Sequence, residues 1–214
     1  MITDAGRTRR ALPGLLTAIA LIPISAYAVL APEGFFAGSS AVFMLAGVVF
    51  ALVGGFVAWH RPENPIGWLF CAYGVITGLG GGAFTVSYLT RPDAPDSSVW
   101  TWLGSVPISA NIGLVVLSFL LFPTGELPSR RWRPVAWVAC VQMVLGMVAA
   151  VLGGGFAGVD EEDFVVVTPF PDSVERIGET LGFGFFPLTM ALIVSSLASL
   201  VVRYRRAVAD EREQ

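Results

Sequence analysis

The side chains with the widest chemical range in this sequence are one histidine, His60, and two cysteines, Cys71 and Cys140. A single histidine cannot build a metal site alone, because zinc sites use three or four protein ligands. The two cysteines should lie at a similar depth inside apolar segments, where a thiol usually behaves as a small hydrophobic side chain. We therefore expect no catalytic, cofactor-binding or metal-binding residue.

A run of four carboxylates, Asp160 to Asp163, is the other place where chemistry is conceivable. Oxygen ligands suit Ca²⁺, but a calcium loop places its ligands at alternating positions, and these four are adjacent. A solvated acidic surface is the favoured interpretation, and a cation site is the alternative. Both would lie in an outer loop that we expect at about 157–179.

The composition points to a membrane protein. Of the 214 residues, 55% are hydrophobic and 14% are charged, whereas about a quarter of the residues in a soluble domain are charged. The apolar residues form blocks of about the length that a helix needs to cross a bilayer. We expect an all-α bundle of about six transmembrane helices within residues 11–202: about 11–31, 39–59, 66–89, 100–122, 134–156 and 180–202.

The arginines predict the orientation, because cytoplasmic loops collect positive charge near helix ends. With the N-terminus inside, the cytoplasmic segments hold all but two of the 13 basic residues, and every basic residue is arginine. Both termini are then cytoplasmic, as a tail at 1–10 and a basic, then mixed-charge tail at 203–214. We expect a multi-pass protein of the inner (plasma) membrane. The triplet Ala26-Tyr27-Ala28 leaves cleavage of the first span as a signal peptide open.

Two polar corners separate spans on the predicted cytoplasmic side. In HRPENPIGWLF, residues 60–70, Asn64 suits a helix N-cap and Pro65 suits the first helical position. Gly67 belongs to the same motif, and Trp68 should lie at the headgroup boundary. The corner explains the polar residues without any active site.

The second corner is LFPTGELPSRRWRPVAW, residues 121–137. Pro123 and Gly125 should end the fourth helix, Pro128 should hold the turn, and Arg131 and Trp132 should anchor the fifth helix. The arginines at 130, 131 and 133 either contact anionic lipid headgroups or serve as ordinary positive-inside anchors, which is the favoured interpretation.

Small residues recur at every fourth position in three spans, which lets helices approach closely in lipid. The favoured role is packing within the bundle, and a homodimer seam is the alternative. The glycines of these faces are Gly47, Gly55, Gly74, Gly78, Gly82, Gly146 and Gly154.

Polar side chains inside the spans are few, and Asn111 and Gln142 are the largest. Each should hydrogen-bond to another helix, with a ligand contact as the alternative. The 13 basic and 16 acidic residues all lie outside the six apolar blocks or at their edges. Ion-coupled transport and voltage sensing need ionisable groups inside the membrane, so this pattern argues against both.

RPENPIGWLFCAYG, followed further along by LLFPTGELPSRRWRPVAW, resembles the N-terminal membrane region of actinobacterial two-component sensor histidine kinases. The resemblance covers roughly residues 40–214. It implies an input region, since such kinases continue with a phosphoacceptor helix and an ATP-binding domain. Without those domains we expect no kinase activity in this chain itself, although a longer parent would be an enzyme.

Two functional interpretations follow. The first is a membrane-embedded sensor or input module without catalysis of its own. The second is a stand-alone structural or accessory membrane protein that docks a partner or anionic lipid through its arginines. In both, the lipid bilayer is the main partner, no cofactor is needed, and nucleic acid is not expected to bind.

Overall fold

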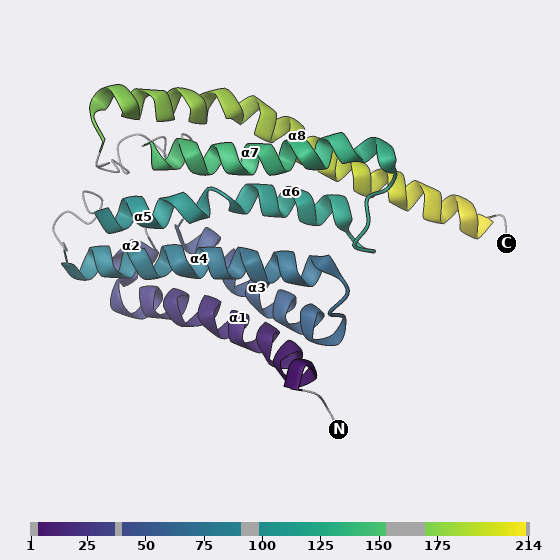
Figure 1. Ribbon diagram of the computed structural model, residues 1–214, viewed down its shortest axis with the longest axis horizontal. Helices are drawn as coiled ribbons and strands as arrows, with labels where there is room; N and C mark the ends of the chain where they lie inside the picture. Colours follow the sequence, from purple (N-terminus) through teal and green to yellow (C-terminus); the bar gives the residue numbers. More distant parts are fainter. Residues whose placement is uncertain (1–3, 37–39, 91–98, 153–169, 213–214) are drawn as a thin grey trace.

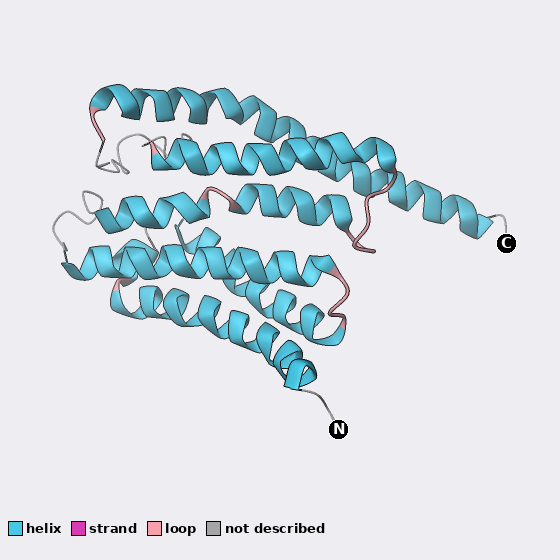
Figure 2. Ribbon diagram, in the orientation of Figure 1, coloured by secondary structure: helices cyan, strands magenta, loops and turns pink. Residues whose placement is uncertain are grey.

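The computed structural model describes residues 4–36, 40–90, 99–152 and 170–212, and every element in these ranges is helical (Figures 1 and 2). Six helical segments are long and apolar enough to cross a membrane. The prediction of an all-α bundle with about six spans is confirmed, and the chain is a multi-pass integral membrane protein. The elements are α1 (Asp4–Leu30), α2 (Pro32–Phe35), α3 (Ser40–His60), α4 (Pro65–Thr90), α5 (Val99–Ile108), α6 (Asn111–Leu121), the 3₁₀ turn η2 (Arg130–Trp132), α7 (Arg133–Val151) and α8 (Asp172–Arg212).

The spans pack in two groups. Helices α1, α3 and α4 form one group, helices α5 to α8 form the other, and the two groups meet along α4. Helices α1, α3 and α4 contact one another, and α4 also contacts α5 and α6. Helix α7 packs on α5 and α6, and α8 packs on α6 and α7. Figure 1 shows both chain ends at the same end of the bundle, together with the corners that follow α3 and α6. The assignment of that end to the cytoplasm remains a prediction from the arginines.

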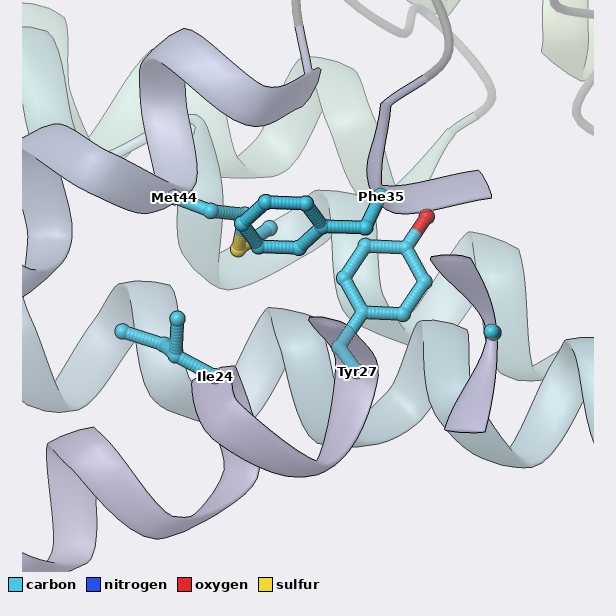
Figure 3. Packing of buried hydrophobic residues seen from close by; sticks show 5 residues of the cluster. Ile24, Tyr27, Phe35 and Met44 are labelled. Carbon is cyan, nitrogen blue, oxygen red and sulfur yellow. The ribbon is translucent and has the colours of Figure 1, made fainter. Parts of the chain in front are cut away.

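Two apolar clusters hold the groups together. One lies among α1, α2 and α3, where Tyr27 packs edge-on against Phe35 with ring centroids 5.7 Å apart, next to Met44 (Figure 3). The other joins α6, α7 and α8 through buried residues that include Leu120 and Leu192. Large apolar side chains such as Val29 and Trp137 are exposed along the helices, as expected where lipid surrounds a protein.

The fourth span is broken, although the sequence predicted a single helix over about 100–122. Helix α5 ends at Ile108 and α6 begins at Asn111. The Ser109 hydroxyl donates to the Val106 carbonyl at 2.6 Å, and the Ala110 N–H turns to the Pro107 carbonyl at 3.0 Å. In a continuous helix the Ala110 N–H would bond to the Val106 carbonyl, which here accepts from the Ser109 hydroxyl instead. The neighbouring Pro107 has no backbone N–H, so the helix also lacks a hydrogen bond at that residue.

Helix α8 is longer than its predicted span of about 180–202. It begins at Asp172, so residues 172–179 are helical, whereas the sequence predicts an outer loop at about 157–179. The acidic residues Asp172 and Glu175 lie in its first turn, where their negative charges interact favourably with the positive end of the helix dipole. The four-carboxylate run at 160–163 lies outside the described residues.

Candidate functional site at the predicted cytoplasmic end

The corner between α3 and α4 is held by its own polar groups. The Asn64 side-chain oxygen accepts a hydrogen bond from the Ile66 N–H at 3.0 Å, and α4 begins at Pro65. The Trp68 indole N–H donates to the Pro62 carbonyl at 2.9 Å and so closes the turn. A Cβ on Gly67 would come within 2.7 Å of the Ala58 backbone nitrogen, so glycine lets α4 start against α3.

His60 is the last residue of α3. One of its ring nitrogens, Nδ1, lies 2.9 Å from the Phe56 carbonyl in the preceding turn. Cys71 and Cys140 are free thiols. Within the described ranges, no three histidine, cysteine or acidic side chains gather in a cluster that would hold a metal ion.

The corner between α6 and α7 is an extended loop that leads into a 3₁₀ turn. Helix α6 ends at Leu121, whose carbonyl accepts from the Gly125 N–H at 2.8 Å, and Gly125 has a φ of 82°. That left-handed conformation favours glycine. Pro123 and Pro128 flank this turn, and Trp132 packs against the cluster that contains Leu120. The exposed Arg131 lies within the 3₁₀ turn.

The two corners pack directly against each other. A Cβ on Gly125 would come within 2.6 Å of Pro65 Cδ and 3.1 Å of the Asn64 side-chain oxygen. The loop after α6 therefore sits on the first residues of α4. The two motifs that were recognised separately in the sequence form one layer at this end of the bundle.

Arg203 joins α8 to the same layer. One guanidinium nitrogen donates to the Thr124 hydroxyl at 3.1 Å, and the other donates to the Leu120 carbonyl at 2.9 Å and to the Glu126 carbonyl. Leu120 lies in the last turn of α6, where carbonyls have no partner within the helix, so the arginine supplies a C-terminal cap. We call the contacts of Asn64, Pro65, Gly125 and Arg203 the corner layer.

Sequence reasoning counted Arg203 only as a positive-inside charge. Its acceptors lie 77 to 83 residues away in the chain, so no local pattern identifies them. The one available signal is position, since Arg203 is the first charged residue after the sixth apolar block.

The predicted packing glycines fall into tight and open positions. A Cβ on Gly47 would come within 2.5 Å of Thr77 Cγ2, and one on Gly74 within 2.6 Å of Ala51 Cβ. Gly55 faces the Thr17 hydroxyl and Gly78 faces the backbone of Ala20. The closest atom to a Cβ on Gly82 would be Pro23 Cβ at 3.3 Å, and on Gly146 the Ser109 carbonyl at 3.8 Å. Gly154 lies outside the described residues.

Gly146 thus differs from the close-packing glycines of α3 and α4, because a methyl group there meets only ordinary van der Waals contact. Sequence reasoning also missed Gly54 and Gly113. A Cβ on Gly54 would meet the Cys71 backbone nitrogen at 2.5 Å, and one on Gly113 would meet Met143 Cβ at 2.7 Å.

Gln142 and Asn111, the two largest polar side chains predicted in the spans, each bond to a threonine on another helix. The Gln142 amide donates to the Thr189 hydroxyl at 2.8 Å, which links α7 to α8. The Asn111 amide donates to the Thr77 hydroxyl at 3.0 Å, which links the start of α6 to α4. The Asn111 side-chain oxygen is buried without a hydrogen-bond partner.

This arrangement gives an expected order of stabilities for variants at this bond. Thr77→Val removes the acceptor and leaves the whole Asn111 amide unpaired, so it should destabilise the protein by about 1–3 kcal/mol. Adding Asn111→Leu should recover part of that loss, because no polar group then remains buried. Unfolding in a mild detergent titrated with a denaturing one measures each variant.

The matched control is Thr85→Val on the same helix. The Thr85 hydroxyl donates only to the Gly81 carbonyl of α4 at 2.8 Å, so its removal strands no amide on another helix. Two results would contradict a stabilising role for the hydrogen bond between Asn111 and Thr77. One is a loss of stability in Thr77→Val no larger than that in Thr85→Val. The other is a further loss of stability when Asn111→Leu is added to Thr77→Val.

Comparison with protein-family models, with curated proteins and with solved structures finds no match for this chain. The resemblance to the membrane region of sensor histidine kinases therefore rests on sequence motifs alone, namely the two corners and the basic, then mixed-charge tail at 203–214. The geometry at these motifs is the basis for any statement about function.

Proposed function

We propose that this chain is a membrane-embedded input module of the plasma membrane, with both termini in the cytoplasm. A change of helix packing inside the bilayer would pass through α8 to the segment that follows it. The observation that carries this proposal is the position of Arg203, which ties a continuous helix to the corner layer at the point where that helix leaves the bundle.

The length of α8 supports this role. Its 41 residues would span about 60 Å at about 1.5 Å per residue, against a hydrocarbon core of about 30 Å. Figure 1 shows its C-terminal part extending past the other helices. Helix α8 continues through Pro187, so a shift or rotation in the membrane can pass along it to whatever is attached beyond it.

The contacts of α8 offer two points at which the bundle can act on it. Deep in the bundle, the Thr189 hydroxyl accepts a hydrogen bond from the Gln142 amide of α7. At the cytoplasmic end, the Arg203 guanidinium donates a hydrogen bond to the Leu120 carbonyl at the end of α6. A stimulus acts on such a module only if it favours one of two packing arrangements over the other. The corner layer would then set how α8 leaves the membrane in each arrangement.

A fusion protein tests the proposal. Residues 1–214 are joined in frame to the cytoplasmic part of a histidine kinase through linkers that sample one heptad of helix phase. Autophosphorylation in proteoliposomes should vary periodically with linker length. Arg203→Gln should change it by up to roughly tenfold, the factor that corresponds to about 1.4 kcal/mol.

Arg205→Gln is the matched control, since the Arg205 side chain is exposed and bonds to none of the described residues. It should leave autophosphorylation unchanged. Equal outputs at every linker length, together with equal outputs of the two arginine variants, would overturn the proposal.

A further inference from the structure

The arginines of the 3₁₀ turn differ from Arg203 in their surroundings. The side chains of Arg130, Arg131 and Arg133 are exposed, and no side-chain hydrogen bond or salt bridge joins them to any residue that the structure describes. Arg203, in contrast, is engaged by three acceptors. Arg203 thus contributes to packing within the bundle, whereas the three arginines just before and at the start of α7 follow one another closely in the chain and their side chains have no partner among the described residues.

The backbone that carries these arginines is fixed. The Trp132 N–H donates to the Ser129 carbonyl at 3.1 Å, and the Trp132 side chain packs on the cluster between α6, α7 and α8. Helix α7 starts at Arg133 with no acidic residue in its first turn. No charge of α7 itself offsets the three guanidinium groups at this point.

The same turn lies at the expected height of the lipid headgroups. A candidate span begins at Arg130, and Trp137, one turn into α7, is 71% exposed. Indole rings favour the boundary between headgroups and hydrocarbon. The guanidinium groups would then lie at the level of the lipid phosphates, which they match as planar, bidentate donors.

We propose that Arg130, Arg131 and Arg133 form a binding surface for the headgroup of an anionic phospholipid. The zwitterionic phospholipids share the phosphate but also carry a cationic ammonium group, so selectivity comes from net charge. This surface stands apart from the input-module proposal, since its test measures lipid retention and uses no output domain.

The test uses the whole chain, purified in detergent with equal amounts of phosphatidylglycerol and phosphatidylcholine, and measures retained lipid by native mass spectrometry. The wild-type chain should retain phosphatidylglycerol preferentially. Arg130→Gln with Arg133→Gln should weaken this retention by roughly 30-fold, and added salt should weaken it further.

The matched control removes the same number of charges elsewhere on this end, through Arg61→Gln with Arg205→Gln, and should keep the preference. Unchanged thermal stability of both variants in phosphatidylcholine alone shows that folding is intact. Equal losses in the two variants would overturn the proposal in favour of general attraction to positive charge. Equal retention of the two lipids by the wild-type chain, or full displacement by inorganic phosphate, would also overturn it.

Discussion

Gly78→Ala is expected to destabilise the bundle by about 1–3 kcal/mol, the usual cost of overpacking a well-packed interior. The added methyl group would lie 2.6 Å from the Ala20 carbonyl oxygen and 2.9 Å from Ala20 Cα. Both are backbone atoms, so no side-chain rotation relieves the contact and α1 must move away from α4. Equilibrium unfolding in detergent micelles, followed by circular dichroism, measures the change.

Gly146→Ala is the matched control on another helix. Its methyl group would meet nothing closer than the Ser109 carbonyl at 3.8 Å, so the alanine should be neutral or slightly stabilising through its higher helix propensity. Similar destabilisation by the two substitutions would mean that α1 and α4 do not approach each other as described. A larger loss at Gly146 would place the critical contact on α7 instead.

Arg203→Gln is expected to release the loop after α6 from α8. Hydrogen bonds to a charged donor contribute about 1.5–3 kcal/mol each, and a glutamine amide cannot reach three acceptors on the loop and the end of α6. Amide hydrogen exchange in residues 122–129 should then become faster by roughly tenfold or more, because local opening costs less. Exchange in α1 and α3 should stay unchanged.

Arg205→Gln again provides the comparison, because it removes the same charge from the same helix without removing a bond to the loop. Exchange in residues 122–129 should match that of the wild-type chain. If Arg203→Gln also left this exchange unchanged, Arg203 would be an ordinary interfacial charge and the corner layer would not include α8.

The sequence predicted the spans and the corners well because both depend on local signals. Apolar length identifies a membrane helix, and Asn64 followed by Pro65 marks a helix start wherever it occurs. The break in the fourth span was missed. Pro107 lies inside a long apolar block, and the competing hydrogen bond from Ser109 is invisible in a hydrophobicity pattern.

The partners of the packing glycines could not be predicted from their spacing. Gly74 and Gly78 belong to one stripe of α4, yet Gly74 meets Ala51 of α3 and Gly78 meets Ala20 of α1. Spacing identifies a face of a helix, and the tertiary arrangement decides which neighbour that face meets. For the same reason, the contact between Gly125 and Pro65, which joins the two corners, could not be predicted from the sequence.

The most direct test of this account is the membrane topology of the chain. Alkaline phosphatase and green fluorescent protein are fused, in separate experiments, after residue 95 and after residue 128. We expect phosphatase activity only at 95 and fluorescence only at 128, which would place the corner layer, the arginines of the 3₁₀ turn and the exit of α8 in the cytoplasm. Signals from both positions on one side, or phosphatase activity at 128, would contradict it.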